Sequence, residues 1–356
     1  MTVRTPGDGE ESIADEVKGR IDGMSIRMPA DAEDRIPDEV EQILAQGLRD
    51  HFRRPVGIAE LHSTILENTF GTHPIYRLHL TLDDGQRLAL IFKWLQPQQD
   101  EDGRREVLVY RRLLTSGRFD APTVYASLCD TARRRYWLFV EDVGELQLPR
   151  CEVNHWPAAF RWVARMHAEY YGREGELRAF GYLGEHGPLF YRFLARGARE
   201  MLQWLDAPRR VARFERLMAR WFDDSVDHLA RQPRTLLHGD LECHNLMVQP
   251  GPKIRPIDWG YAAIGVAGWD VAKLIAGWGP EKRHFIGVYL DEFALNASVP
   301  LDRQSFEHTL AHCRIMRTLQ ILYWWEGPYE NLAFVDGVLE EMESACRYLD
   351  SERSDG

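Results

Sequence analysis

Residues 236–274 read LLHGDLECHNLMVQPGPKIRPIDWGYAAIGVAGWDVAKL. Two short apolar runs, Leu246–Val248 and Ile254–Ile257, flank a turn that contains proline and glycine, a pattern typical of a β-hairpin. Asn245 precedes the first run and Asp258 closes the second. Because the start of one antiparallel strand lies beside the end of its partner, we expect Asn245 and Asp258 to lie close together.

Asp240 stands on the loop before this hairpin, so three oxygen-bearing side chains are expected at one end of it. Phosphoryl transfer needs oxygen ligands for Mg²⁺, which takes few protein carboxylates besides the nucleotide phosphates. It also needs a carboxylate that orients the attacking hydroxyl and accepts its proton. The order Asp-x4-Asn, hairpin, Asp matches the catalytic loop and metal-binding segment of protein kinases. We therefore predict Asp240 as the catalytic base and Asn245 and Asp258 as Mg²⁺ ligands.

The motifs also carry a family resemblance. His238-Gly239-Asp240 stands where protein kinases have His-Arg-Asp, and Asp258-Trp259-Gly260 stands where they have Asp-Phe-Gly. Together with the segment WDVA at 269–272, they resemble the aminoglycoside phosphotransferase and choline kinase family of small-molecule kinases. The resemblance covers roughly residues 40–350. It implies an α+β, bilobal, protein-kinase-like fold, with a small five-stranded antiparallel N-lobe and a larger, mostly α-helical C-lobe.

The resemblance extends to two supporting residues. His238 is expected to hold the catalytic loop by hydrogen bonding and packing. Asp270 resembles the acidic residue that follows the metal segment in this family and braces that loop. Asp270 could also be the N-cap of a helix predicted over 271–278, and the two roles are compatible. Lys273, one turn later, receives no predicted role, because it could pair with a carboxylate or face solvent.

Composition limits the class of protein. The chain has 356 residues, is 44% hydrophobic and has a net charge of −11, which argues against nucleic acid or an anionic membrane as its main partner. No apolar run is long enough to span a bilayer, and the N-terminal sequence lacks the apolar segment of a secretory signal. The five cysteines are widely spaced without a CxxC pair, which fits free thiols in a reducing cytosol. We therefore expect a cytoplasmic enzyme.

The domain plan follows from the change in apolar periodicity. Residues 1–36 are polar, acidic and rich in glycine and proline, which predicts a flexible or loosely attached arm. Residues 37–143 are the predicted nucleotide-binding N-lobe, 144–350 the catalytic and acceptor-binding C-lobe, and 351–356 a disordered tail. The N-lobe is predicted to hold a helix at 37–52 and strands at 58–66, 73–82, 86–95, 124–128 and 136–143. The C-lobe is predicted to hold helices at 156–171, 190–204, 214–229, 271–278, 285–293, 306–325 and 332–349.

Lys93 lies in a predicted strand, on the same face as Ala89 and Ile91. An unpaired buried ammonium is unfavourable, so Lys93 needs an anionic partner. In a kinase the partners are the nucleotide phosphates and a glutamate on the following helix. We predict Glu106, which opens the helical pattern EVLVYRRLL, in preference to Glu101, which lies in a polar loop. The alternative, that Lys93 extends to solvent at a sheet edge, is weaker beside the downstream motif.

Two further nucleotide contacts are expected. A kinase places the loop at 67–72 over the phosphates, but this loop has one glycine and lacks GxGxxG, so an ordinary hairpin turn is an equal alternative. The segment LFVEDVGEL leaves the sheet where the resembling family has its hinge. By that resemblance, the Glu141 carbonyl and the Val143 amide would bind the base of ATP, with GTP as an open alternative.

The acceptor side of the cleft is less defined. Within the stretch at 322–330, Trp325, Glu326 and Tyr329 combine aromatic and acidic groups that would suit an amino sugar or quaternary amine. The alternative, that the tryptophans are packing residues of a helix, is favoured over an acceptor role. Glu242 is a further candidate facing the acceptor. The oligomeric state is not predicted.

A zinc site is the rival interpretation of HGDLECH, because His238, Asp240, Cys243 and His244 are all possible ligands. It is disfavoured, since their spacing matches no fixed zinc motif.

The sequence thus predicts a Mg²⁺-dependent kinase that transfers the γ-phosphate of ATP or GTP to a hydroxyl of a small molecule. Aminoglycosides, other antibiotics, sugars, nucleosides and amino alcohols are all candidate acceptors, and resistance and biosynthetic roles both stay open. The alternative is a catalytically silent kinase-like fold that binds a ligand or partner, against which the complete set of motif residues argues. A protein kinase is disfavoured, because the chain lacks an Ala-Pro-Glu segment and the interval from Asp258 to Asp270 is too short for an activation loop.

Overall fold

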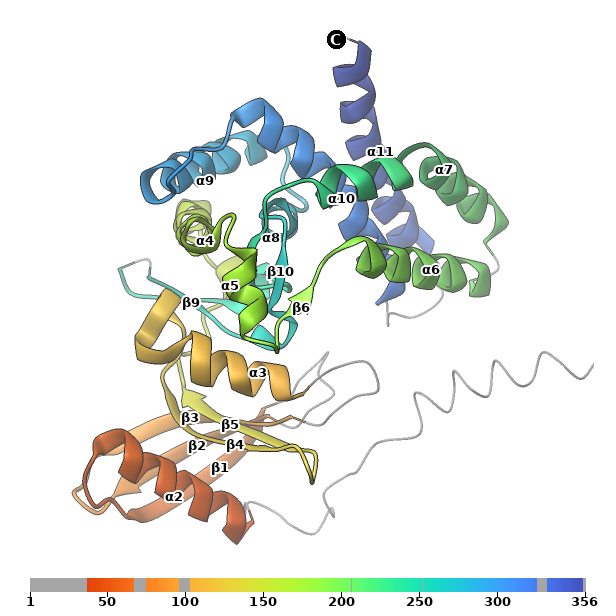
Figure 1. The fold of residues 1–356 in the computed structure, drawn as a ribbon. Helices are drawn as coiled ribbons and strands as arrows, with labels where there is room; N and C mark the ends of the chain where they lie inside the picture. Colours follow the sequence, from red (N-terminus) through yellow and green to blue (C-terminus); the bar gives the residue numbers. More distant parts are fainter. Residues whose placement is uncertain are drawn as a thin grey trace, which may run out of the picture.

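The computed structural model of the chain describes residues 37–66, 75–95, 103–205, 207–251, 253–324 and 332–354. It contains an antiparallel sheet with a helix on its outer face, followed along the chain by a larger, mostly helical part (Figure 1). This is the predicted α+β fold class. The predicted arm at 1–36 lies outside the described residues, and the lobe boundaries at 143 and 350 stay predictions.

The N-terminal sheet has five strands in the order β1-β2-β3-β5-β4, and each neighbouring pair is antiparallel. Alternation of apolar residues produces these strands: Leu78, Leu80 and Leu82 of β2 all lie on one buried face. The five predicted strands are therefore confirmed. Their bounds are β1 (Ile58–Leu66), β2 (Ile75–Leu82), β3 (Arg87–Leu95), β4 (Val124–Asp130) and β5 (Arg135–Glu141).

Helix α2 (Asp38–Phe52) covers the outer face of this sheet (Figure 1). Val40, Leu44 and Leu48 recur every four residues, so they form one apolar stripe, and all three are fully buried against the sheet.

Strand β5 is buried on both faces. Trp137 and Phe139 join the apolar cluster under α2, whereas Leu138 and Val140 join the large cluster of the helical part. The sheet is therefore a middle layer between α2 and the rest of the molecule.

The connection from β3 to β4 carries the predicted glutamate. It forms α3 (Arg104–Leu108), which continues as a π-helix, η1 (Val109–Leu113), and then as a 3-10 helix, η2 (Thr115–Asp120). The sequence predicts one helix from Glu106, and the structure begins it two residues earlier. Glu106 is buried on the inner side of α3.

The helical part is built around α10, which packs against α6, α7, α8 and α11. Its helices are α4 (Trp156–Tyr170), α5 (Glu174–Ala179), α6 (Pro188–Trp204), α7 (Pro208–Ala230), α8 (Gly268–Leu274), α9 (Lys282–Asn296), α10 (Arg303–Tyr323) and α11 (Leu332–Ser354). Short 3-10 helices are η3 (Leu148–Arg150), η4 (Val153–His155), η5 (Cys243–Asn245) and η6 (Trp259–Tyr261). The predicted helices are present, with shifted ends.

Two small sheets support the segment that opened the sequence analysis. The first joins β6, β10 and β7, and the second is the hairpin of β8 and β9. The strands are β6 (Gly184–Glu185), β7 (Thr235–Leu237), β8 (Leu246–Gln249), β9 (Lys253–Pro256) and β10 (Ala263–Gly265).

Two helix ends differ from the prediction because of tertiary contacts. Helix α7 begins at Pro208 rather than near Phe214: proline is favoured in the first turn, and Arg210 and Arg213 there pair with acidic side chains of α11. Helix α11 continues to Ser354, where the Gln304 side chain donates to Glu352 at 3.0 Å, so residues 351–354, predicted as part of a disordered tail, are helical.

Helix α8 corrects a third prediction. It begins at Gly268, where a Cβ atom would lie 3.0 Å from Cys313 Sγ, and Gly277 has a φ of 77° just beyond its end. The helix is therefore shifted to the N-terminal side of the predicted 271–278. Asp270 lies inside its first turn, and Ala267 occupies the N-cap, so the N-cap prediction for Asp270 is wrong.

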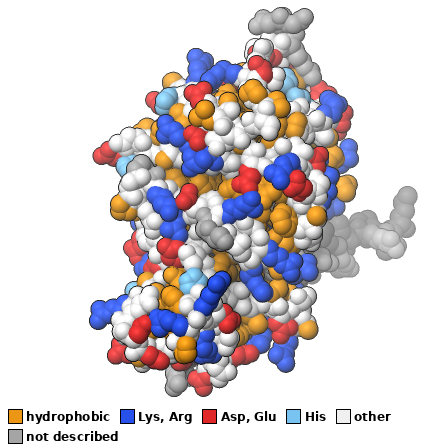
Figure 2. Space-filling view, turned by 60° about the vertical axis from the view of Figure 1, so that its left-hand side comes forward, with side chains coloured by type: hydrophobic (Ala, Val, Ile, Leu, Met, Phe, Trp, Pro, Cys, Tyr) orange, Lys and Arg blue, Asp and Glu red, His pale blue; other side chains and the backbone are white. Residues whose placement is uncertain are grey.

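Acidic and basic side chains are interspersed on the face shown in Figure 2, rather than gathered by sign. Many charged side chains among the described residues form ion pairs, such as Arg213 with Glu343 and Arg314 with Glu341. Among the helices that the structure describes, none combines the length and the apolar character needed to cross a membrane.

Candidate active site

The predicted hairpin is present. Leu246 pairs with Pro256 at the end of the β8–β9 ladder, and the Ile257 amide donates to the Asn245 carbonyl at 2.9 Å. This register puts Asn245 at the same end of the hairpin as Asp258, the residue after Ile257.

Asp240 lies against Asn245. The Asn245 side-chain amide donates to the Asp240 carbonyl oxygen at 2.9 Å and to its carboxylate Oδ2 at 3.1 Å. The loop residues that were predicted to act together are therefore held together before any ligand binds.

Glycine is required between His238 and Asp240. Gly239 has a φ of 82°, a left-handed conformation that side-chain-bearing residues rarely adopt. A Cβ atom at this position would lie 1.9 Å from the Tyr261 carbonyl oxygen. The close crossing of the loop that holds Asp240 and the segment after Asp258 thus excludes a side chain at position 239.

The Asp270 carboxylate accepts two backbone N–H groups of this loop, from His238 at 2.8 Å and from Gly239 at 3.1 Å. His167 Nε2 lies 3.3 Å from the same carboxylate, and both side chains are fully buried. Burial would raise the pKa of Asp270, but the hydrogen bond with His167 and the hydrogen bond from the His238 backbone amide leave that pKa below its usual value. Asp270 therefore fixes the loop as an ionised acceptor.

His238 joins the loop to the other end of the hairpin. Its Nε2 lies 2.9 Å from the Ile257 carbonyl, and because a carbonyl only accepts, Nε2 carries the proton. Its ring packs 4.6 Å from that of Trp259. Burial lowers the pKa of His238, so the ring is neutral near pH 7. His238 thus contacts the residues on both sides of Asp258 as a neutral side chain.

Lys93 reaches the hairpin from the N-terminal sheet. Its Nζ lies 2.7 Å from Glu106 Oε1 and 3.0 Å from Asp258 Oδ1. Its strand, β3, lies between β2 and β5, so the sheet-edge alternative for Lys93 is wrong. Burial would lower the pKa of Lys93, but the charges of Asp258 and Glu106 raise it above its usual value. The alternative partner, Glu101, lies outside the described residues.

Asp258 has a φ of 67°, a left-handed conformation that costs energy for a residue other than glycine. Its side chain is 45% exposed, although Lys93 contacts one of its oxygens. The Arg105 guanidinium donates to the Gly260 carbonyl at 3.2 Å and helps to fix the backbone that follows. Asp258 therefore presents a carboxylate to solvent from a fixed, strained turn.

Lys273 is the functional candidate that the sequence reasoning missed. Its Nζ lies 2.7 Å from Asp240 Oδ1 and 3.5 Å from Glu242 Oε1, and its side chain is only 3% exposed. Burial would raise the pKa of Asp240, but the charge and hydrogen bond of Lys273 hold that pKa below its usual value. A signal was present: lysine is rare in this chain, and Lys273 follows Asp270 on a short helix that is otherwise apolar.

Glu242 is partly exposed and also lies 3.5 Å from Arg317 Nη2 on α10. The other three acceptor candidates, Trp325, Glu326 and Tyr329, fall outside the described residues. The described residue next to them, Trp324, packs against Tyr261 at 4.7 Å between ring centroids. An aromatic side chain of the 322–330 stretch therefore contacts the segment that follows Asp258.

At the predicted hinge, β5 ends at Glu141. The Glu141 carboxylate pairs with Arg255 Nη2 at 2.6 Å, and the Val143 carbonyl accepts from the Gln249 side chain at 3.4 Å. These contacts join the hinge to the β8–β9 hairpin. Base binding by the Glu141 carbonyl and the Val143 amide stays a prediction, and the loop at 67–72 lies outside the described residues.

The donor set near the hairpin fits Mg²⁺, because a carboxylate and a side-chain amide supply hard oxygen atoms and leave positions for phosphates. It does not fit the rival zinc site. Within the described ranges, His238, Asp240, Cys243 and His244 do not converge as metal ligands, and His238 is engaged with a carbonyl.

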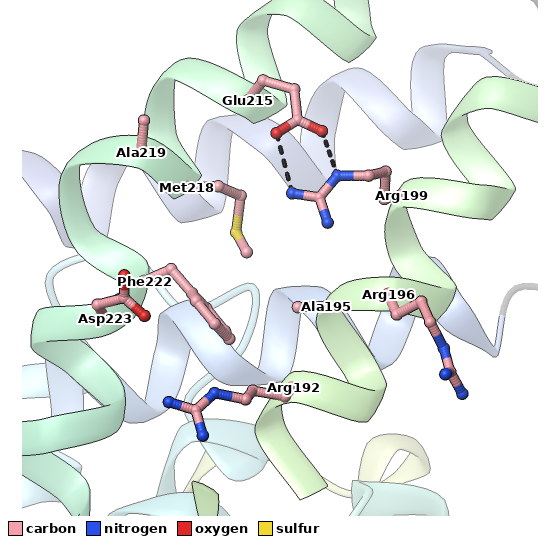
Figure 3. Close-up of a pocket in the computed structure, with 9 residues that line it drawn as sticks. All are labelled: Arg192, Ala195, Arg196, Arg199, Glu215, Met218, Ala219, Phe222 and Asp223. Atoms are coloured by element: carbon pink, nitrogen blue, oxygen red, sulfur yellow. Dashed lines mark hydrogen bonds and ion pairs between the residues drawn. The ribbon is translucent and has the colours of Figure 1, made fainter. Parts of the chain in front are cut away.

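Two hollows in the described part of the chain lie away from these residues. One hollow, of about 360 Å³, lies between α6 and α7 (Figure 3). Arg199 and Glu215, which line it, form an ion pair. The second, of about 820 Å³, lies between α2, η1 and β4. No predicted site residue lines either of them.

Comparison with known proteins gives the following likenesses. The sequence profile of the phosphotransferase enzyme family matches residues 76–301. The fold is similar to that of an aminoglycoside phosphotransferase from Alicyclobacillus acidocaldarius, with 14% identity, a TM-score of 0.50, and coverage of 82% of this chain and 92% of that one. This likeness shows the predicted kinase-like fold.

Two further structures are a choline kinase from Streptococcus pneumoniae and an ethanolamine kinase from Plasmodium vivax. Each is 14% identical, with TM-scores of 0.49 and 0.47. The first match covers 88% of this chain and 99% of that one, and the second 80% and 81%. Comparison with curated proteins found no match.

Proposed function

Because the chain belongs to the phosphotransferase enzyme family, we propose that it is a Mg²⁺-dependent kinase that transfers the γ-phosphoryl group of ATP or GTP to a hydroxyl of a small molecule. One observation carries the proposal: Lys93 of the N-terminal sheet and Asp258 of the hairpin meet at 3.0 Å, beside the loop that holds Asp240 and Asn245. An ammonium, two carboxylates and a side-chain amide, the groups that phosphoryl transfer requires, thus lie close together although they belong to separate elements.

Lys93 and Glu106 form the nucleotide-binding pair of this proposal. Glu106 is buried and holds the Lys93 ammonium at 2.7 Å, so the ammonium is fixed in position before the nucleotide arrives. Fixing a long side chain in advance lowers the entropy lost on binding. Lys93 would then donate to the α- and β-phosphates.

Asp258 and Asn245 would hold Mg²⁺, which supplies positive charge to the phosphates as the γ-phosphorus–oxygen bond breaks. The exposed carboxylate of Asp258 and the amide oxygen of Asn245 are suitable donors, and the site leaves room for phosphate oxygens and water. The left-handed turn at Asp258 fixes the direction of its carboxylate.

Asp240 would orient the acceptor hydroxyl and take its proton as the new phosphorus–oxygen bond forms. Lys273 occupies one carboxylate oxygen, Oδ1, and Asn245 contacts the other, Oδ2. The low pKa of Asp240 makes it a weak base, which suits a loose transition state in which the proton leaves late and positioning matters most. We propose Lys273 as a positioning residue for this base.

The acceptor is proposed only as a class, a hydroxyl-bearing small molecule that enters beside Glu242. The predicted acceptor group of Trp325, Glu326 and Tyr329 stays part of the proposal. Aminoglycosides, other antibiotics, sugars, nucleosides and amino alcohols are the compounds to test.

The test is thermal unfolding of the protein with ATP or GTP, with and without Mg²⁺. A ligand at 100 times its dissociation constant stabilises the native state by about 2.7 kcal/mol, which shifts the melting temperature measurably. We expect Mg²⁺-nucleotide to stabilise the wild type and Asp258→Asn to lose the Mg²⁺-dependent part. Asp291→Asn, at an exposed position on α9, is the matched control.

The nucleotide that stabilises the protein is then used in an acceptor screen that follows phosphate transfer. If neither nucleotide shifts the melting temperature of the wild type at millimolar concentration, the proposal fails and the silent binding fold replaces it.

A further inference from the structure

Three histidines gather where α7 packs on α10. His228 lies on α7, and His308 and His312 lie on α10. Each offers one ring nitrogen, and these nitrogens all lie within 4.8 Å of one another. Among the described residues this is the one group of three or more potential metal ligands that converges in this way.

The two histidines of α10 have the spacing of a helical metal site. Residues four apart lie on the same helix face, an arrangement that zinc enzymes use for paired histidine ligands. Here the two Nε2 atoms are 3.3 Å apart. Two ligands about 2.05 Å from a tetrahedral zinc ion lie about 3.3 Å from each other. The His308–His312 pair therefore already has the separation that an ion requires.

A hydrogen bond to the second ring nitrogen of His312 fixes the orientation of its ring. Its Nδ1 lies 2.8 Å from the hydroxyl of Ser225, one turn before His228 on α7. Histidine ligands of metals almost always use the second ring nitrogen in such a hydrogen bond, which fixes the ring and leaves the first nitrogen for the ion. Ser225 and His312 are both buried, so this contact is shielded from water.

His228 is the ligand that has to move. Its Nε2 lies 2.9 Å from the Thr309 hydroxyl and 3.2 Å from the Gln232 side-chain nitrogen, and its ring stacks on that of His312 with 4.4 Å between centroids. A turn of the ring exchanges these contacts for an ion. His228 and His308 are partly exposed, so an ion can reach the site from solvent.

We propose that His228, His308 and His312 bind one divalent transition-metal ion of the zinc class, which links α7 to α10 and is separate from the proposed Mg²⁺ site. Three imidazole nitrogens favour zinc, cobalt or nickel over magnesium and calcium, which prefer oxygen. Water would complete the coordination.

The experiment uses the full chain in excess Mg²⁺, so that Mg²⁺ competes with the probe at the proposed Mg²⁺ site. Equilibrium dialysis against Zn²⁺ with metal analysis is expected to give one tightly held ion per chain for the wild type, and His308→Gln is expected to lose it. Zn²⁺ should raise the melting temperature of the wild type by several degrees but not that of His308→Gln. Because His308 is partly exposed, the two proteins should melt alike without metal.

Three controls identify the site. His284→Gln, at an exposed histidine of α9, should retain the ion. Asp258→Asn should also retain it, which keeps this test independent of the kinase proposal. Cys243→Ser should retain it as well; Cys243 Sγ and His244 Nδ1 lie 3.9 Å apart and are a second pair of side chains that zinc could bind.

Co²⁺ provides a direct readout, since nitrogen ligation in a four-coordinate site gives visible absorption bands that His308→Gln should lack. The proposal is overturned if His308→Gln and His312→Gln both keep the ion. It is equally overturned if Asp258→Asn or Cys243→Ser abolishes binding.

Discussion

Two of the five lysines of this chain, Lys93 and Lys273, contact carboxylates of the candidate active site. They differ in the element that carries them and in how exposed they are. Lys93 comes from the sheet, contacts the exposed carboxylate of Asp258 and is itself 15% exposed. Lys273 comes from a buried helix, contacts Asp240 and is 3% exposed. The first pair can open to a ligand, whereas the second is part of the protein interior. We infer that Lys93 serves the nucleotide and Lys273 serves the loop.

The largest expected effect is on the rate of phosphate transfer, when Asp240, the partner of Lys273, is substituted. Asp240→Asn removes the group that we propose as the catalytic base, so the rate of phosphate transfer should fall by about 10²–10⁴-fold. The Mg²⁺-nucleotide shift in melting temperature should remain, because Lys93 and Asp258 are untouched. Steady-state kinetics with an accepted substrate checks this, with Asp291→Asn as the control. Full activity of Asp240→Asn would end the assignment of the base.

Exchanging the two lysines for methionine tests the comparison itself. Lys93→Met should weaken nucleotide binding by about 10–100-fold, the loss of a charge-assisted hydrogen bond of about 1.5–3 kcal/mol. Lys273→Met should leave nucleotide binding nearly unchanged and lower kcat. It should also lower the free energy of unfolding by about 3 kcal/mol, because Asp240 loses its buried partner.

The measurements are nucleotide titration, kcat and KM, and urea unfolding of both variants. The comparison breaks if Lys273→Met raises the KM for nucleotide and leaves kcat unchanged, since a residue that positions the base should do the reverse.

The smallest expected effect is on how the free energy of unfolding depends on pH. The pKa of Lys93 is raised and that of Asp240 is lowered, so these two side chains stay charged between pH 5 and 8. A pH response in this range should come instead from buried histidines near the loop. Burial lowers the pKa of His186 to about 3. Below its ordinary value of about 6.5 the unfolded chain binds a proton that the native protein does not, so stability falls as pH falls.

For His186 alone, this linkage is worth about 2 kcal/mol between pH 7 and pH 5. Urea unfolding at the two pH values should therefore show a smaller difference in His186→Gln than in the wild type. The exposed His284→Gln should keep the wild-type difference. An unchanged difference in His186→Gln would mean that other groups carry the acid response.

The same contrast explains what could be predicted from sequence. The five strands and the hairpin follow from alternation and turn residues, which are local signals. The contact of Lys93 with Glu106 was predicted from the resemblance to kinases. The pairing of Lys273 with Asp240 joins residues 33 apart and depends on how α8 packs. The periodicity of apolar residues does not predict such a tertiary contact.

The misplaced N-cap has a related cause. The start of α8 is set by the close approach of Gly268 to Cys313 on α10, a tertiary constraint that overrides the local helix signal. The histidine cluster was missed for the same reason, because His228 and His308 are brought together only by the packing of α7 on α10.

Strand β5, whose residues enter both apolar clusters, has a consequence for how the molecule unfolds. Opening the cluster under α2 exposes Trp137 and Phe139, and opening the other exposes Leu138 and Val140, so neither cluster can separate without disturbing the same strand. Backbone amides of β5 should then be among the slowest of the sheet to exchange with deuterium, at a rate set by global rather than local opening. The two parts of the molecule would melt as a single cooperative unit.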